Sequence, residues 1–256
     1  MSRLLYIAKK KIIAGLGLVL TWDNIINVPV ADASNVAQWN TFFSLPLNGS
    51  PFTSVVVAGN EVNLIGGSGI ALKDNLFRYN YNIVEIVDLI SCITSIGAFS
   101  LSSTTSLVNA KLYGVIISGN FAFNGSGLIN LIAPILKTAG LACFQNMGRL
   151  LLMNLPSLET GDDYCFDTNT SGSYNLPNLT SIGGAGFSNN LNMTNLFLPA
   201  LVAMGSTILD DNIFTNTIGN VIDLTIPSAL MTCNNSQPDG DIQYLQANNT
   251  VTIITV

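Results

Sequence analysis

The chain has 256 residues, of which 48% are apolar and only 9% are charged, and its net charge is −6. Soluble domains usually carry about 25% charged residues, so Asn, Ser and Thr must supply most of the polar surface. Nine basic residues are too few for a nucleic-acid-binding face. Because the chain has no histidine, a Ser-His-Asp triad is excluded, and acid–base catalysis would rest on carboxylates or tyrosine.

The first 30 residues have the outline of a secretory signal. Four basic residues, Arg3 and Lys9 to Lys11, precede an apolar run over residues 12–20, and small residues follow at 31–33. The run is too short to span a bilayer. We interpret residues 1–30 as an uncleaved N-terminal arm that packs into a neighbouring copy or a larger assembly. The alternative is an uncleaved segment that binds a membrane surface.

Residues 31–80 are expected to form a small capping module. A short helix is predicted from Asp32 or Ser34, either of which suits an N-cap, through Phe43, with its apolar face on the first coil of the next region. Alternation over residues 52–72 predicts a β-hairpin. The glycine-rich segment 66–69 lacks the following Lys-Ser/Thr of a phosphate-binding loop, so it is interpreted as a turn.

One short unit recurs between residues 89 and 227. Its clearest copy, Leu176 to Phe187, reads LPNLTSIGGAGF. Successive copies are 21 or 22 residues apart except for the last, which follows after 28 residues. The positions equivalent to Pro177 are Ser91, Tyr113, Pro134, Pro156, Pro199 and Pro227.

Four columns of this alignment keep their character. One residue before the anchor stand Ile90, Leu112, Ala133, Leu155, Leu176, Leu198 and Ile226. Two residues after it stand Ile93, Val115, Leu136, Leu158, Leu179, Leu201 and Ala229. Ten residues after it stand Leu101, Phe123, Phe144, Phe166, Phe187 and Leu209. A fourth column holds Gly97, Gly119, Gly140, Asp162, Gly183 and Gly205, which indicates either positive φ or close approach of neighbouring backbones.

A unit of about 22 residues cannot close a core of its own, so its apolar columns must be covered by the units above and below. The period predicts a mainly β fold: a leucine-rich-repeat solenoid of six to seven coils over residues 81–230. Residues 231–256 form a C-terminal cap, in which a turn at 237–241 leads to closing strands at 242–245 and 251–256. Six or seven extra residues after Leu209, placed around 210–217, are expected to form a surface loop.

The pattern Leu-Pro-x-Leu-x-x-Ile-Gly-x-x-x-Phe resembles the BspA-like, Treponema-type leucine-rich repeats. Leu176 to Phe187 carries the match most fully. The chain departs from that family in having Asn189 or Asn190 where a cysteine usually follows the Phe. Residues 39–73 are similar to the leader of leucine-rich-repeat proteins encoded by Flavobacterium and related Bacteroidetes phages. These resemblances imply binding or scaffolding in bacterial adhesins and phage proteins rather than catalysis.

The remaining reactive residues offer few sites. Cys143 and Cys165 occupy equivalent positions in adjacent coils, so a disulfide is conceivable, although small buried thiols are the expected state. The acidic pairs at 162–163 and 210–211 and the segment 239–241 could supply calcium ligands, but solvated turn acids are the commoner arrangement. We predict no catalytic, cofactor or metal site. Tyr164 and Tyr174 fall between the ladders, where they could stack on sugars or form the edge of the core.

Two functions from different classes remain open, and an enzyme is not expected. In the first, the chain is a structural virion protein of a bacteriophage, displayed outward as a spike or host-recognition component. Residues 1–30 would then bind other virion proteins and further copies of the chain in a homo-oligomer. In the alternative, the chain is a bacterial cell-surface adhesin. In both, the solenoid could bind a host receptor or glycan.

Overall fold

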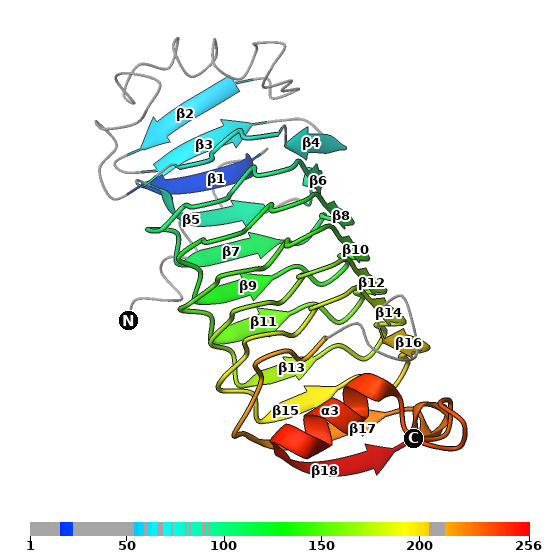
Figure 1. Ribbon diagram of the computed structural model, residues 1–256. Coiled ribbons are helices and arrows are strands. Elements are labelled where there is room, and N and C mark those ends of the chain that lie inside the picture. Colours follow the sequence, from blue (N-terminus) through cyan, green and yellow to red (C-terminus); the bar gives the residue numbers. More distant parts are fainter. Residues whose placement is uncertain are drawn as a thin grey trace, which may run out of the picture.

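The fold is a solenoid in which short β-strands are stacked coil upon coil (Figure 1). A computed structural model describes residues 16–22, 54–58, 61–65, 69–72, 74–79, 81, 83–88, 91, 93–204 and 213–256. Each coil contributes one strand to a first face, one strand to a second face, and a tight turn that closes the third side. The mainly β solenoid predicted from the repeat is confirmed.

The first face is formed by parallel strands in two consecutive groups (Figure 1). The first group contains β5 (Ile83–Asp88), β7 (Asn109–Leu112), β9 (Asn130–Ile132) and β11 (Leu152–Asn154). The second group contains β13 (Ser173–Asn175), β15 (Asn195–Phe197), β17 (Val221–Ile226) and β18 (Thr250–Thr255). Side chains alternate along each strand, so residues such as Leu131 and Leu196 point into the core.

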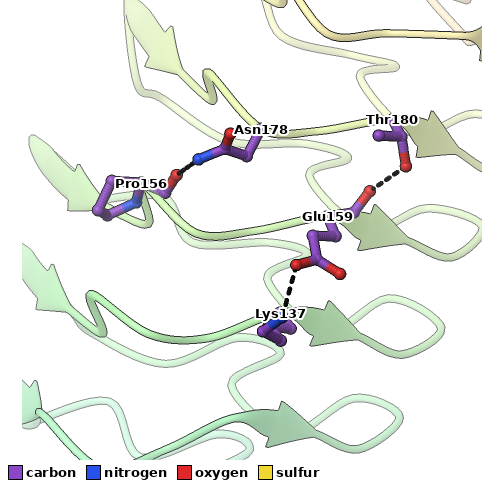
Figure 2. Close-up of polar contacts among 5 residues, drawn as sticks. All are labelled: Lys137, Pro156, Glu159, Asn178 and Thr180. Atoms are coloured by element: carbon purple, nitrogen blue, oxygen red, sulfur yellow. Dashed lines mark hydrogen bonds and ion pairs between the residues drawn. The ribbon is translucent and has the colours of Figure 1, made fainter.

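The second face is a single parallel sheet of shorter strands. Its members are β4 (Ile70–Leu72), β6 (Ile93–Ile96), β8 (Ile117–Ser118), β10 (Thr138–Ala139), β12 (Thr160–Gly161), β14 (Ser181–Ile182) and β16 (Ala203–Met204). Polar contacts join neighbouring coils just before these strands (Figure 2). The Lys137 ammonium lies 2.7 Å from the Glu159 carboxylate. Both side chains are about half exposed, so this ion pair adds little to stability.

At the N-terminal end, three antiparallel strands extend the first face (Figure 1). β2 (Ser54–Ala58) and β3 (Glu61–Ile65) form the predicted hairpin, in which Ala58 pairs with Glu61. β1 (Leu16–Trp22) lies between β3 and β5. Residues 16–22 were expected in an arm that packs into a neighbouring copy or a larger assembly, but they pair with β3 and β5 of the same chain. The rest of the arm and the helix expected from Asp32 or Ser34 lie outside the described residues.

The predicted ladders form one continuous core along the solenoid. The Phe column stacks ring on ring, with centroids 5.5 Å apart for Phe123–Phe144 and for Phe144–Phe166, and 5.2 Å apart for Phe166–Phe187. The next ring in the column is Phe214, which stacks on Phe187 at 6.0 Å. The sequence alignment, made without a gap, placed Leu209 after Phe187 in this column. That assignment is wrong, because Phe214 occupies the position.

The position of Phe214 also moves the expected surface loop. Ile182 pairs with Met204, and Phe187 stacks on Phe214. Phe187 follows Ile182 by five residues, whereas Phe214 follows Met204 by ten. The second of these coils therefore holds five extra residues between its strand and Phe214. Residues 213–217 therefore belong to the regular turn, with Ile213 and Phe214 fully buried. The extra residues fall within 205–212, outside the described residues.

The glycine column exists because neighbouring backbones approach closely, and its described members do not have positive φ. A Cβ on Gly97 would lie 2.6 Å from the backbone nitrogen of Asp74. One positive φ in each turn occurs instead two residues later, at Phe99, Phe121, Ala142, Tyr164 and Ala185. Each of these residues adopts the left-handed conformation without being glycine, and we call them the left-handed column.

Side-chain caps between coils explain which members of the glycine column must be glycine. The carboxylate of Asp163 accepts a hydrogen bond from the backbone N–H of Gly184 at 2.7 Å. Asp74 and Asn120 cap Ala98 and Leu141 in the same way. In each case the cap fills the space beside the glycine of the next coil. The coil before Asp162 has Leu141 at the cap position, which explains why this one member of the column can carry a side chain.

We therefore expect Gly183→Ala to lower the free energy of unfolding by about 2–3 kcal/mol, as overpacked sites do. The added Cβ would overlap the backbone nitrogen and carboxylate of Asp163. Gly148→Ala is the matched control, since nothing lies within 4 Å of a Cβ at Gly148. Urea denaturation of both variants measures the difference. Equal stability of the two variants would contradict the close-approach explanation.

The C-terminal cap contains a helix where strands were predicted. α3 (Gly240–Asn248) begins after Asp239, whose side chain accepts a hydrogen bond from the N–H of Asp241. Ile242 and Leu245 lie three residues apart, on one helical face, and both are fully buried. The predicted strand over 251–256 is present as β18, which pairs in parallel with β17. The N-cap and the i, i+3 spacing favour helix, so the strand prediction for 242–245 was wrong.

Candidate functional site

The two tyrosines considered for sugar stacking have different environments. Tyr174 is 2% exposed and packs edge-on against Phe166 and Phe187, with its hydroxyl donating to Asn190 Oδ1 at 2.8 Å. Burial raises the pKa of this hydroxyl well above its usual range. Tyr164 is 47% exposed on the turn side. Tyr174 is therefore part of the core, and only Tyr164 is available to a ligand.

Tyr164 borders a depression of about 420 Å³ on the turn side of the solenoid, which we call the turn-side depression. Three successive turns, at residues 163–168, 184–189 and 213–216, form it. Its lining combines one aromatic ring, one carboxylate, one amide, two hydroxyl groups and two small residues: Asp163, Tyr164, Gly184, Ala185, Ser188, Asn189 and Thr215. Such a mixture of an apolar surface with convergent polar groups is typical of ligand sites.

The left-handed column explains why the ring of Tyr164 stays uncovered. Phe99 and Phe121 occupy this column in adjacent coils and stack on each other, with centroids 4.8 Å apart and planes 7° apart. The neighbours of Tyr164 in the column are Ala142 and Ala185. Among the described residues nothing stacks on the Tyr164 ring, and the small side chain of Ala185 leaves space beside it.

A chain of side-chain hydrogen bonds stiffens the rim of the turn-side depression. Asn189 donates to Asp167 at 2.8 Å and accepts from Asn216 at 3.1 Å. Asp167 also accepts from Gln145 at 2.7 Å. Each bond joins one coil to the next, so the amide of Asn189 has a fixed orientation. A site whose polar groups are already held in place loses less conformational entropy when a ligand binds.

The candidate calcium ligands do not form a metal site among the described residues, where no group of three acidic, cysteine or histidine side chains comes together. Asp162 accepts a hydrogen bond from the N–H of Asp163, and Asp163 caps Gly184. Asp239 caps α3, and Asp241 accepts from the N–H of Ile213 at 2.8 Å. These acids therefore hold turns and helix ends. Asp210 and Asp211 lie outside the described residues.

Cys143 and Cys165 are free and fully buried, as expected from their column. Burial raises the pKa of the Cys143 thiol to about 12, and burial raises that of Cys165 well above its usual range. Cys233 is exposed. Because the thiolate is the reactive form, catalysis by either buried thiol is not supported.

We expect iodoacetamide at pH 8 to modify Cys233 in the native protein at least about 100-fold faster than Cys143 or Cys165, since the buried thiols stay protonated and inaccessible. Peptide mass spectrometry after timed quenching measures the three rates. In denaturant all three should react alike. Rapid labelling of Cys143 in the native protein would show that the core around it opens.

The chain has a marked charge asymmetry around this site. Arg149 is the last basic residue, so residues 150–256 carry nine acidic side chains and no basic one. Residues 1–149 hold the nine basic and the other six acidic side chains, since 15 − 9 = 6, and so carry a net charge of +3. The turn-side depression lies wholly within the acidic part. Its field therefore disfavours an anionic ligand.

A model of the BspA type leucine rich repeat region matches six copies over residues 70–194 and 159–254. These matches cover more than half of the chain, and the chain belongs to the BspA-type leucine-rich-repeat family. No curated protein matches the sequence. Among the described residues, no helix has the length and apolar character that crossing a bilayer requires.

Three solved structures of bacterial proteins are similar at low identity. A leucine rich cell surface protein from Faecalibacterium prausnitzii shares 15% identity with a TM-score of 0.41, and the match covers 68% of this chain and 62% of that one. A leucine-rich repeat protein from Bacteroides ovatus shares 13% identity with a TM-score of 0.29, over 78% and 67% of the two chains. The pneumococcal vaccine antigen PcpA shares 10% with a TM-score of 0.29, over 68% and 67%. None of the three supports the phage association expected from residues 39–73.

Proposed function

We infer that the chain is a non-catalytic, adhesin-like protein of a bacterial surface that binds its ligand on the solenoid. The turn-side depression with its uncovered Tyr164 ring is the observation that carries this inference. It offers recognition groups on a rigid support, since the residues around it are tied to the coils above and below.

Two further observations support binding over catalysis. Asp163, which lines the depression, and its chain neighbour Asp162 are both engaged in capping hydrogen bonds. The two thiols in the adjoining core are buried, and burial raises the pKa of each. Membership of the leucine-rich-repeat family agrees with a binding or scaffolding role.

The surface role is tested by locating the protein in its native source. Antibody against the solenoid should label intact cells, and mild surface proteolysis should release solenoid fragments. Intact-mass measurement and N-terminal sequencing of the envelope fraction then define the mature chain. The virion function expected from the sequence remains the competing hypothesis. Recovery of the chain in purified phage particles, with no labelling of intact cells, would replace the adhesin proposal with that one.

A further inference from the structure

We propose that the turn-side depression binds an uncharged saccharide, with one sugar ring lying against the face of Tyr164. This inference rests on the proposed binding function and names the ligand class of the same site. The observation behind it is the left-handed column, in which aromatic rings of adjacent coils stack when both are present. Phe99 and Phe121 show this arrangement, with ring centroids 4.8 Å apart.

Tyr164 offers the same stacking position, and no described residue stacks on its ring. The next coil places Ala185 at the equivalent position, and Gly184 before it has no side chain at all. A flat, partly apolar group of ring size fits beside the Tyr164 ring in a depression of about 420 Å³. The apolar face of a pyranose is such a group, and its hydroxyls would point toward the polar rim.

The rim supplies both kinds of hydrogen-bonding group that sugar hydroxyls require. Asp163 uses Oδ1 to cap Gly184, and its Oδ2 has no partner among the described residues. Asn189 brings an amide whose orientation is fixed by Asp167 and Asn216. A carboxylate and an amide on one side of an aromatic ring can accept from and donate to neighbouring hydroxyls of one sugar.

The negative charge around the turn-side depression favours uncharged saccharides over anionic ones. No basic residue occurs after Arg149, and Asp162 and Asp163 are both exposed beside Tyr164. A sialylated, sulfated or phosphorylated sugar would meet carboxylates with no compensating cation in this part of the chain. A neutral oligosaccharide would not be repelled by these carboxylates. A basic peptide would also suit the charge, but it would not need a stacking surface with two small neighbours.

The test uses the full chain on an array of immobilised neutral oligosaccharides, their sialylated and sulfated counterparts, and tetralysine, followed by calorimetry on the best neutral probe. Tyr164→Ala should fold normally, because Ala142 and Ala185 already occupy this column at the same backbone conformation. We expect it to weaken neutral-sugar binding at least about tenfold, equivalent to about 1.4 kcal/mol. Tyr164→Phe keeps the ring and should stay within about threefold of the parent chain.

Tyr113→Ala is the matched control, since Tyr113 is 40% exposed and lies outside the depression. It should leave binding unchanged. The proposal is overturned if no neutral oligosaccharide binds, if Tyr164→Ala and Tyr113→Ala behave alike, or if tetralysine or the anionic sugars bind in preference. None of these results would alter surface labelling of intact cells, so failure of the saccharide proposal is distinguishable from failure of the surface role.

Discussion

Phe166→Ala should lower the free energy of unfolding by about 4 kcal/mol, in the range measured for large-to-small substitutions of buried aromatic residues. Phe166 is fully buried between Phe144 and Phe187. It also packs edge-on with Tyr174, with ring centroids 5.6 Å apart. The turns that carry these phenylalanines are fixed by backbone hydrogen bonds between coils, so the walls of the new cavity cannot collapse into it. Urea denaturation measures the loss.

Two variants bracket this result. Phe166→Leu should cost roughly half as much, because Leu101 occupies the same column at its N-terminal end. Leu151→Ala removes a large apolar side chain that is 77% exposed, and it should change stability by less than about 0.5 kcal/mol. If Phe166→Ala cost no more than Leu151→Ala, the stacked rings would not be a stabilising core.

Asn190→Ala should be comparably destabilising, by about 3–4 kcal/mol, for a different reason. Asn190 is fully buried, and its Oδ1 accepts from the Tyr174 hydroxyl at 2.8 Å and from the N–H of Asn169 at 3.2 Å. Its Nδ2 donates to the carbonyl of Phe166 at 2.9 Å. Alanine would leave two buried donors without an acceptor, at roughly 1–3 kcal/mol each.

A double-mutant cycle separates the lost hydrogen bonds from lost packing. Tyr174→Phe removes one of the two stranded donors, so Asn190→Ala should cost about 1–2 kcal/mol less in that background. Asn178→Ala is the surface control, since Asn178 is exposed and makes a single bond to the carbonyl of Pro156 (Figure 2). Its loss should stay below about 1 kcal/mol. Additive costs for Asn190 and Tyr174 would contradict the proposed network.

The repeat allowed the core to be predicted from sequence because burial in a solenoid follows residue type. Columns such as Leu155, Leu176 and Leu198 are buried as expected. The last member of the Phe column was predicted wrongly, because an ungapped alignment placed Leu209 where the structure has Phe214. Helix α3 was missed although Asp239 and the spacing of Ile242 and Leu245 favour it. The apolar residues of the last coil were read as a continuation of the strands before it.

The candidate site was only half predictable. Tyr164 and Tyr174 stood out together as aromatic residues between ladders, and nothing in their residue type distinguishes core from surface. Their burial depends on the conformation of the turn. Tyr164 has a left-handed backbone, and because it is not glycine the sequence does not indicate this conformation. The alanines on either side of Tyr164 are visible in the sequence, but their meaning requires knowing that positions 142, 164 and 185 are stacked.

The caps of Asp74, Asn120 and Asp163 recur in every second coil, so the interchangeable module of this solenoid is a pair of coils. Excising the single coil that contains Leu141 would place the Asn120 side chain against the Cβ of Asp162. Excising that coil together with the next would place Asn120 beside Gly183, which has the space for it. Shortening or lengthening the solenoid by two coils should therefore be tolerated, whereas a change of one coil would place a capping side chain beside a residue that is not glycine.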